Sequence, residues 1–545
     1  MKYRINQIKT DIDTDKAELP RIAARKIGVS EDEIREFEIL RKSIDSRKKP
    51  HIQFVYAVSF ATDKKLNLKK HPEITPVDEE GAENKNVTED HKTHTDQVDK
   101  TPSTKNACRP VVVGTGPCGL FAALELARAG LRPLVIERGP AMDERVAAVE
   151  KFKKDRVLDP EANLLFGEGG AGTFSDGKIG TGIKDGLIRK VLAEFRDAGA
   201  GEEIMYLAKP HIGTDVLKTV IVNIRKKICE SGGEIRFETR LKGINTDGSR
   251  LESICVECGG EEEVIKTDAL IVAIGHSARD TFAMLKDAGL NMEQKPFSIG
   301  VRMEHPQDLI NASQYGEANL SRCTDALSAE KEIGKLPPAD YKLSYKASNG
   351  RGVYSFCMCP GGEVVVCSTR DGELCVNGMS SRKRDSGTAN SGILCDVKIS
   401  DFESDDVLAG VRFQEKFERL AFKLGGGDFT PPKCSMEEFL SEDPTGTWAE
   451  AVLGSLPDFA ADAIREAVPN FARKIKGYDM PDAVVTSVET RSSSPVRILR
   501  DNKGESNIKG IYPAGEGAGY AGGITSAACD GIRAARNLMH ALNER

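Results

Sequence analysis

The 545-residue chain has little aromatic content and no long apolar segment. It contains one tryptophan, and Phe, Tyr and Trp together make up 6% of it. A membrane-spanning helix needs about 20 consecutive, mostly apolar residues, and the sequence has no such run. Residues 1–7 lack the apolar core of a secretory signal. These absences predict a cytoplasmic protein without a membrane partner.

The chain also lacks a strong charge excess and a recognisable metal-ligand spacing. Its formal net charge is -7, which gives no general case for nucleic-acid binding. Thirteen cysteines without a secretory signal indicate reduced thiols, not a disulfide framework. Cys255 and Cys258 have the C-x-x-C spacing but no second pair or histidine at zinc-site distance. We therefore predict no metal site, and nucleic acid is not the expected partner.

Residues 109–139 contain a strand, a glycine-rich turn, a helix, a second strand and an acid, in that order. Gly114 permits a tight turn, Gly116 lets the backbone approach a pyrophosphate, and Gly119 lets the helix pack on the strand. The helix N-terminus offers free N–H groups to the phosphates. Glu137 follows about 20 residues later, where a carboxylate can accept hydrogen bonds from ribose hydroxyls. The segment predicts a dinucleotide site.

Residues 510–535 read as a short strand, a glycine-rich loop and a helix that begins near Gly523. They resemble the late segment of FAD enzymes of the glutathione-reductase type, in which a Gly-Asp pair contacts the ribityl chain. Gly515 and Glu516 take these positions here, with Glu in place of the usual Asp. The resemblance implies that the helix N-terminus points at the flavin, where its dipole stabilises negative charge on the reduced ring. An enzyme that binds only NAD needs no such segment, so we expect FAD.

Three further segments resemble parts of the same fold. Residues 267–278 read as a buried strand with a turn at Gly275, like the strand beside the cofactor in flavoproteins. Residues 232–244 resemble the strand whose backbone contacts the adenine. Residues 244–266 alternate like the short antiparallel strands of a crossover meander.

From about residue 109 onwards the chain resembles the uncharacterised FAD-dependent dehydrogenase family, also described as NAD(P)/FAD-dependent oxidoreductases. The signature blocks are residues 166–178, 295–306, 355–362, 377–380 and 489–497. The resemblance implies an oxidoreductase with non-covalent FAD. The cofactor-binding residues that we expect are Gly114, Gly116, Pro117, Cys118, Gly119, Glu137, Arg138, Gly172, Thr173, Lys178, Leu241, Gly275, Gly515, Glu516, Gly522, Gly523 and Ile524.

The expected fold class is α/β: a Rossmann-type FAD-binding domain with a β-rich inserted substrate domain and a small N-terminal α/β module. The expected boundaries are 1–72 for the module, 73–107 for a flexible linker, 108–295 and 476–545 for the two parts of the FAD-binding domain, and 296–475 for the inserted substrate or cap domain.

Within the module we expect strands near 3–8 and 51–60 and helices at 19–27 and 31–40. The linker is nearly free of large apolar groups and cannot order itself. The module should therefore be dispensable for FAD binding. Strands are also expected at 297–303, 352–359 and 363–367, in a sheet that covers the flavin.

Four residues are weak candidates for chemistry beside the cofactor. Cys357 and Cys359 alternate along a predicted strand, which puts both sulfurs on one face; they could exchange electrons with the flavin or be two small buried hydrophobic residues. His276 could act as an acid or base, or be a turn histidine. Arg302 could bind an anionic substrate or form a structural ion pair. The chain lacks the C-x-x-x-x-C arrangement of disulfide reductases, which makes disulfide reduction a weaker hypothesis.

The expected function is hydride transfer between a small organic substrate and FAD, with the substrate bound between the inserted domain and the flavin. No second strand–glycine turn–helix unit is present in the sequence, so NAD(P)H would be a transient electron donor. The alternative is an RNA-associated flavoprotein whose basic N-terminal module docks nucleic acid. The acidic net charge counts against it.

Overall fold

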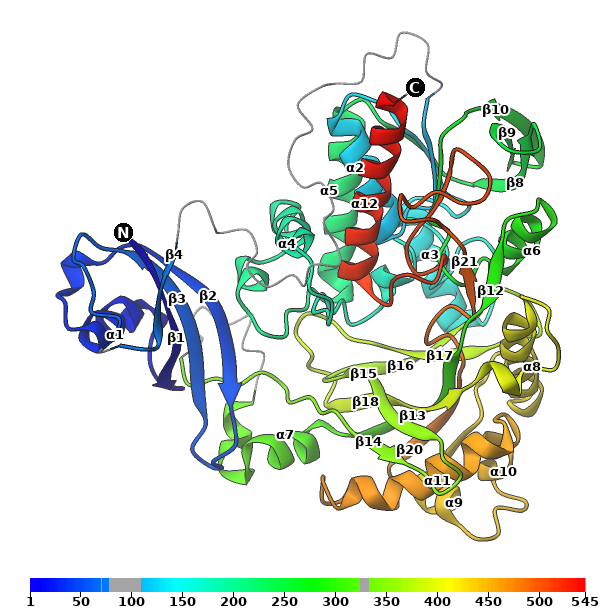
Figure 1. Ribbon diagram of the computed structural model, residues 1–545. Helices are drawn as coiled ribbons and strands as arrows, with labels where there is room; N and C mark the ends of the chain where they lie inside the picture. The colour runs from blue at the N-terminus through cyan, green and yellow to red at the C-terminus, as the bar shows by residue number, and fades with distance from the viewer. Residues whose placement is uncertain (70, 78–108, 324–332, 545) are drawn as a thin grey trace.

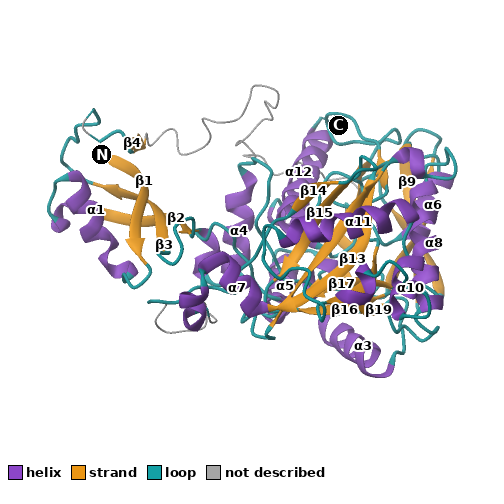
Figure 2. Ribbon diagram, turned by 90° about the horizontal axis from the view of Figure 1, so that it is seen from below, coloured by secondary structure: helices purple, strands orange, loops and turns teal. Residues whose placement is uncertain are grey.

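A computed structural model describes residues 1–69, 71–77, 109–323 and 333–544. Figure 1 shows a small N-terminal module beside a larger body, and Figure 2 shows the same separation from a second direction. The body consists of a domain built on a parallel sheet, the parallel domain, and one built on an antiparallel sheet, the antiparallel domain. None of the helices within these described ranges is both long and apolar enough to span a membrane.

The N-terminal module is an antiparallel sheet of order β2-β3-β1-β4 with α1 packed on it. Its strands are β1 (Lys2–Asp11), β2 (Arg35–Asp45), β3 (Gln53–Ala61) and β4 (Ile74–Val77). The helix α1 (Leu19–Ile27) buries Leu19, Ala23 and Ile27, which form one apolar stripe at helical spacing.

Two predictions for this module are wrong. Residues 31–40 contain no second helix, because a short 3-10 turn at Glu31–Glu33 leads directly into β2. The pairing of β2 with β3 shifts register twice, between Arg35 and Glu38 and between Ile39 and Arg41. These shifts break the alternation by which a strand is recognised in a sequence. In addition, β4 falls inside the segment assigned to the linker; the rest of that segment lies outside the described residues.

The module contacts the body along the edge of β2. The Lys42 N–H donates to the Tyr206 carbonyl at 2.7 Å, and the Lys42 carbonyl accepts from the Ala208 N–H at 2.9 Å. On the other side of the contact, the Asn319 side chain donates to the Pro50 carbonyl at 2.8 Å. The module is therefore packed against the body, contrary to the expectation of an independent unit.

The parallel domain contains a five-stranded parallel sheet of order β22-β11-β5-β6-β7. Its strands are β5 (Val111–Val113), β6 (Leu134–Ile136), β7 (Glu234–Arg236), β11 (Leu270–Val272) and β22 (Ile511–Pro513). Neighbouring residues along β5, β6, β11 and β22 enter two separate hydrophobic cores, one on each face. Burial on both faces explains why these strands are continuous apolar runs in the sequence.

Different elements cover the two faces of this sheet. Figure 1 shows α2 (Pro117–Arg128), α5 (Thr214–Glu230) and α12 (Ile524–Asn543) side by side on one face, with α4 (Leu187–Asp197) packed on α12. The other face carries an antiparallel meander and α6 (Arg279–Asp287). The meander strands are β8 (Thr239–Thr246), β9 (Leu251–Cys258) and β10 (Glu261–Lys266). The predicted meander at 244–266 is confirmed.

The antiparallel domain is built on a six-stranded sheet of order β14-β15-β18-β13-β20-β19. Its strands are β13 (Phe297–Pro306), β14 (Ser344–Lys346), β15 (Gly352–Cys359), β18 (Thr388–Val397), β19 (Lys433–Ser435) and β20 (Val484–Glu489). A hairpin of β16 (Glu363–Cys367) and β17 (Cys375–Met379) packs against it. The three strands predicted in this region are confirmed, although β16 pairs with β17 and not within the large sheet.

Helices surround the antiparallel sheet and join the domains. α11 (Asp458–Ala472) packs against β13, β14, β15 and β18. The remaining helices are α3 (Met142–Asp155), α7 (Gln307–Tyr315), α8 (Ala409–Leu424), α9 (Met436–Leu440) and α10 (Trp448–Gly454).

The antiparallel domain continues past the predicted boundary at residue 475. β20 pairs with both β13 and β19, so it belongs to the six-stranded sheet. After it, β21 (Val496–Ile498) pairs with β12 (Met292–Gln294) where the two domains meet. The chain thus returns to the parallel domain only after β20. The predicted boundary was too early because periodicity identifies a strand but not the strands with which it pairs.

Candidate functional site

The first glycine-rich turn lies between β5 and α2. A Cβ at Gly114, whose φ is 101°, would lie 2.5 Å from the Ala273 carbonyl oxygen, and one at Gly119 would overlap the Gly114 carbonyl. At Gly116 the nearest atom to such a Cβ is Gly170 Cα, at 4.0 Å. Gly114 and Gly119 are therefore needed for packing. Gly116, in contrast, borders open space.

The N-terminus of α2 is open to a ligand. Gly116 is its N-cap residue, and no side chain caps it. The first N–H groups of a helix have no acceptor within the helix, so an uncapped end favours an anion. Cys118 is buried, and its thiol lies against Gly515. Cys118 can therefore contribute its backbone to this end of the helix, but not its sulfur.

The N-terminus of α12 has the same properties. Gly523 is its N-cap residue without a capping side chain, and a Cβ at Gly522 or Gly523 would meet no atom within 4 Å. The Thr525 hydroxyl donates to the Ile179 carbonyl at 2.6 Å and holds the first turn against the body. The predicted helix start near Gly523 is confirmed. This end presents backbone and the positive end of the helix dipole to open space.

The glycine-rich loop, residues 167–178, runs between these two helix ends. A Cβ at Gly172 would lie 3.1 Å from the Ile524 side chain and 3.6 Å from that of Pro117. Thr173 is buried within the loop. The loop thus brings the first and last glycine motifs of the chain to one place.

A buried arginine that sequence analysis missed fixes the segment before this loop. Arg145, on α3, is fully buried and donates to the backbone carbonyls of Asn163, Leu164 and Glu168. Burial lowers the pKa of Arg145 to about 10. No sequence signal marked it, because an arginine on a helix usually faces solvent.

Glu137 joins the first glycine turn to the glycine-rich loop. Its Oε2 accepts from the N–H of Thr115 at 2.9 Å and from the hydroxyl of Thr115 at 2.8 Å. Its Oε1 accepts from the N–H groups of Gly139 at 3.0 Å and Gly167 at 3.2 Å. The carboxylate is 6% exposed. Its contact with ribose hydroxyls stays a prediction.

Two other residues expected to contact the cofactor point into the protein. The Arg138 guanidinium pairs with Glu161 at 2.6 Å and Asp280 at 2.8 Å and lies over the Phe166 ring. The Leu241 side chain is buried in the core beneath the meander. A cavity of about 290 Å³ with mostly charged walls opens beside Arg138.

Gly275, His276 and Glu516 meet beyond the carboxyl end of the parallel sheet. His276 Nε2 lies 3.7 Å from Glu516 Oε1. Burial raises the pKa of Glu516 to about 7. Burial, assisted by neighbouring cations, lowers the pKa of His276 to about 3. The buried His276 Nδ1 has no hydrogen-bond partner among the described residues, and such an orphaned atom indicates a place for a polar ligand.

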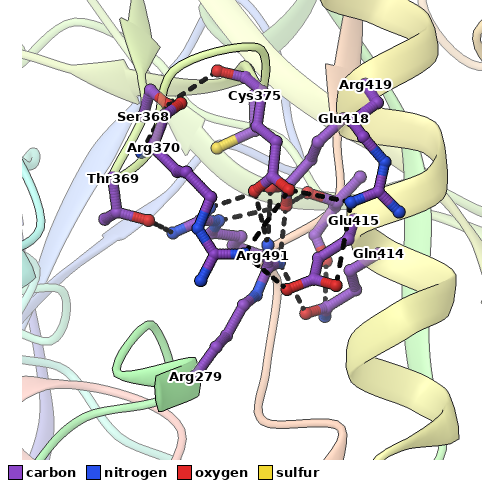
Figure 3. A network of polar contacts seen from close by, with 12 residues as sticks. Arg279, Ser368, Thr369, Arg370, Cys375, Gln414, Glu415, Glu418, Arg419 and Arg491 are labelled. Atoms are coloured by element: carbon purple, nitrogen blue, oxygen red, sulfur yellow. Dashed lines mark hydrogen bonds and ion pairs between the residues drawn. The ribbon is translucent and has the colours of Figure 1, made fainter. Parts of the chain in front are cut away.

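An ion-pair network missed by sequence analysis joins the two domains (Figure 3). Arg279, at the start of α6, donates to Glu418 of α8 at 2.7 Å. Arg491, after β20, donates to the same carboxylate at 2.8 Å. The two arginines hold the pKa of Glu418 well below its usual range, although burial opposes this shift.

The predicted role of Arg302 in binding an anionic substrate is wrong. Arg302 is fully buried on β13, and its terminal nitrogens donate to the Cys357 carbonyl and to Asn377, Asn390 and Glu489 at 2.9 to 3.0 Å. Its Nε lies 2.7 Å from the Glu489 carboxylate. The guanidinium is therefore enclosed by protein groups and has no exposed surface for a ligand.

Cys357 and Cys359 lie at a bulge of β15 and not on a regular strand. The register with β18 breaks between Phe356 and Cys359, and Cys357 has a φ of 40°. Cys359 is buried, whereas Cys357 is partly exposed. Lys178, the last residue of the glycine-rich loop, donates through Nζ to the Met358 carbonyl between them. The structure therefore brings the two cysteines to the glycine-rich loop.

A larger cavity that sequence analysis missed lies between α3, the β16–β17 hairpin and strands β19 and β20. Its volume is about 870 Å³, and its walls include Phe152, Glu304, Glu363 and Lys433. Trp448, the only tryptophan of the chain, lines it and is 57% exposed. An exposed tryptophan cannot be recognised from the sequence, so no signal marked this cavity.

The residues that meet around the glycine-rich loop fit an FAD molecule. Gly116, Gly522 and Gly523 leave space along two uncapped helix N-termini, as a pyrophosphate and a flavin ring require. The orphaned nitrogen of His276 lies between the first and last strands of the cofactor motifs.

Family comparisons agree with this geometry. Residues 107–148 match an FAD binding domain, and residues 296–492 match a domain described as "FAD-dependent protein, C-terminal domain-like". Residues 1–61 match a domain of unknown function. The FAD-binding match is general and does not specify the glutathione-reductase type.

Individual proteins extend the comparison. An uncharacterised protein of Clostridium beijerinckii is 43% identical over 555 residues, covering 99% of both chains. Digeranylgeranylglycerophospholipid reductase of Methanocaldococcus jannaschii is 27% identical over 191 residues, covering 35% of this chain and 42% of that protein. A solved flavin-dependent brominase shares 14% identity over 81% of this chain and 80% of its own, with a TM-score of 0.38. The chain belongs to the family of the Clostridium beijerinckii protein and is an FAD-dependent oxidoreductase.

Proposed function

We propose that this oxidoreductase transfers a hydride between a small organic substrate and non-covalently bound FAD. The observation that carries the proposal is the meeting of two uncapped helix N-termini, those of α2 and α12, on either side of the glycine-rich loop. When bound, FAD supplies the two-electron chemistry, and the chain supplies binding, orientation and electrostatics.

The proposed binding mode assigns a part of the cofactor to each helix end. The N–H groups after Gly116 would hold the pyrophosphate, because the glycine lets the phosphates approach the backbone. Glu137 would lie at the ribose. The N-terminus of α12 would stabilise negative charge on the ring through its dipole. Glu516, with its raised pKa, can hold a proton near neutral pH beside His276.

The substrate would lie between the start of α12 and the β15 bulge. Cys357 is partly exposed at this bulge, and Lys178 Nζ donates to the carbonyl of the neighbouring Met358. Ligand pockets commonly form between domains, and here the parallel domain supplies the loop while the antiparallel domain supplies the bulge. NAD(P)H would deliver electrons as a transient visitor.

The proposal is tested by anaerobic mixing of the yellow holoenzyme with NADH or NADPH, followed by a substrate screen on the reduced protein. Bleaching of the flavin absorbance by a nicotinamide, and its return with one organic substrate, are the expected results. A flavin that neither nicotinamide nor any substrate reduces would contradict the proposal.

A variant locates the cofactor in the same experiment. Gly116→Val puts a side chain where the pyrophosphate must approach, so the purified protein should lose most of its FAD. Gly182→Val is the matched control, because a Cβ at Gly182 meets no atom within 4 Å and the residue lies outside the proposed site. Full FAD content in Gly116→Val would exclude this placement.

The RNA-associated alternative is not supported by the comparisons. Some basic residues of the module also pair with carboxylates. Asp45 pairs with both Lys9 at 3.2 Å and Arg47 at 2.7 Å, and Lys64 pairs with Glu33 at 2.8 Å.

A further inference from the structure

The two cysteines of the β15 bulge have different surroundings. Cys359 is fully buried, and its thiol lies 3.2 Å from the Cys357 carbonyl, to which it donates. Cys357 is partly exposed and has the left-handed φ of 40° that non-glycine residues rarely adopt. Strain of this kind persists where surrounding contacts enforce it, often at functional sites.

Cations face this pair from two other elements. Arg302 of β13 donates to the Cys357 carbonyl at 2.9 Å and lies 4.0 Å from the Cys359 sulfur. Lys178 of the glycine-rich loop donates to the Met358 carbonyl. The nearby carboxylates are already paired: Glu489 with Arg302 and Asp176 with Arg384.

These surroundings distribute one proton unequally between the two sulfurs. The Cys359 thiol as hydrogen-bond donor, followed by Lys178 and Arg302, lowers the pKa of Cys357 well below its usual range. The pKa of Cys359 is raised, first by its hydrogen bond to Cys357 and then by burial. The cations around the bulge and the directions of the two pKa shifts favour Cys357 as the thiolate, and its partly exposed position makes it the sulfur that can meet a substrate; the thiolate is the nucleophilic form.

The bulge is tied to the proposed flavin site by a single segment. Lys178 contacts the bulge, and the carbonyl of the next residue, Ile179, accepts from Thr525 in the first turn of α12. Further back in the same loop, Gly172 lies against Ile524. A group at the start of α12 therefore lies close to the bulge.

We propose that Cys357 and Cys359 form a redox-active dithiol that reduces a small disulfide and regains its electrons from reduced FAD. This inference rests on the proposed function and names the substrate class for it. The pair differs from the C-x-x-x-x-C arrangement of disulfide reductases, since it lies on the antiparallel domain and not on the first helix. A disulfide that spans one residue is strained, and strained disulfides are the easily reduced, catalytic ones.

The steps balance in electrons and protons. The Cys357 thiolate attacks one sulfur of the substrate disulfide, whose S–S bond breaks and releases one thiolate. Cys359 then attacks the Cys357 sulfur, releases the second thiolate and gives its proton to a released thiolate, which leaves a Cys357–Cys359 disulfide. When bound and reduced, FAD would supply the two electrons and one proton that return the pair to thiolate and thiol.

The first test measures thiol reactivity in the holoenzyme. Iodoacetamide is applied between pH 5 and 9, and each cysteine is quantified by peptide mass spectrometry, with the exposed Cys258 as the internal reference. Cys357 should react at least about tenfold faster than Cys258 at pH 6, the ratio for one pKa unit. Equal rates at every pH would overturn the assignment of the thiolate.

Two lysine variants distinguish the direct contact of Lys178 with the bulge from the loss of any nearby positive charge. Lys178→Met should move the reactivity of Cys357 towards higher pH. Lys218→Met removes a neighbouring charge that lies over Phe174 without contacting the bulge, and it should leave the profile unchanged. The same shift in both variants would contradict a specific role for Lys178.

The second test uses 4,4′-dithiodipyridine as the probe disulfide. One equivalent should release two equivalents of thiopyridone and leave a Cys357–Cys359 disulfide, whereas Cys359→Ser should stop at a mixed disulfide on Cys357. The oxidised holoenzyme should then take up four electrons in anaerobic titration, and Cys357→Ser/Cys359→Ser only two. A two-electron uptake by both proteins would overturn the inference while leaving NAD(P)H reduction of FAD intact. Dithiol oxidation with a flavin that no nicotinamide reduces would instead count against the proposed function.

Discussion

At the scale of single residues, Glu137 shows how one side chain serves both the fold and the site. Its carboxylate accepts four hydrogen bonds that connect β6, the first glycine turn and the glycine-rich loop. A carboxylate at this place would also receive the ribose hydroxyls of the dinucleotide. The two roles differ in what they predict for FAD affinity.

Glu137→Ala should weaken FAD binding by about 1.5–3 kcal/mol, the range for hydrogen bonds to a charged group. The measurement is a fluorescence titration of the apoprotein with FAD. Glu150→Ala, an exposed glutamate on α3, is the control and should bind FAD normally. Unchanged affinity in Glu137→Ala would leave the carboxylate with a structural role alone.

Glu516 makes the stability of the apoprotein depend on pH. Burial raises its pKa to about 7 from the usual value of 4.5, so near neutral pH the folded chain binds a proton that the unfolded chain has lost. The stabilisation is complete below about pH 4.5 and is lost as the pH rises through 7. The free energy of unfolding should therefore fall by up to about 3 kcal/mol between pH 5 and 8, and Glu516→Gln should remove this decrease. Thermal unfolding of both apoproteins across that range provides the measurement; parallel pH profiles would show that Glu516 is ionised in the folded state.

Residues differ in how far the sequence predicted them. The roles of Gly114, Gly116 and Gly119 follow from backbone geometry, which local sequence determines, and the packing around them agrees with each. Arg302 was not predictable, because its acceptors come from three other strands that lie far away in the chain. A long polar side chain can be assigned only when its partners are known.

At the scale of elements, the edge of β2 is the contact that holds the N-terminal module on the body. The Lys42 N–H and carbonyl both pair with the segment 206–208. The module shares a hydrophobic core with the body as well. Sequence periodicity predicted β1, α1 and β3, but the irregular β2 was missed because its register shifts hide the alternation.

Lys42→Pro tests this contact, since proline has no N–H to donate to Tyr206. The module should loosen, and the amides of residues 206–208 should exchange with solvent faster. Lys42→Ala keeps the N–H and should behave like the parent chain. Hydrogen exchange measured by mass spectrometry reports the change. Identical exchange in both variants would show that the hydrogen bonds between Lys42 and residues 206–208 contribute little to holding the module on the body.

At the scale of the whole molecule, one carboxylate forms ion pairs that join the two large domains. Glu418 of α8, in the antiparallel domain, binds Arg279 of the parallel domain and Arg491 at the return of the chain (Figure 3). The sequence predicted that an inserted domain would cover the cofactor. It could not predict how that domain is held, because the three residues lie on separate elements and only Arg491 belongs to one of the signature blocks.

Glu418→Gln removes the charge that compensates two buried arginines. Breaking a buried pair from one side costs about 3–5 kcal/mol, because the remaining charges stay desolvated. We expect a lower melting temperature and weaker FAD retention, since the proposed flavin site lies where these domains meet. Glu415→Gln is the matched control: it lies one turn earlier on α8 and pairs with the more exposed Arg370 and Arg419.

The pH dependence gives an independent check on the same carboxylate. Because Arg279 and Arg491 lower the pKa of Glu418, its stabilisation is present above the usual glutamate pKa of 4.5 and is lost as the pH falls below it. The parent chain should therefore lose stability in acid more steeply than Glu418→Gln, and the two melting curves should converge at low pH. A Glu418→Gln chain that melts like Glu415→Gln at neutral pH would show that packing alone, without this network, holds the domains in place.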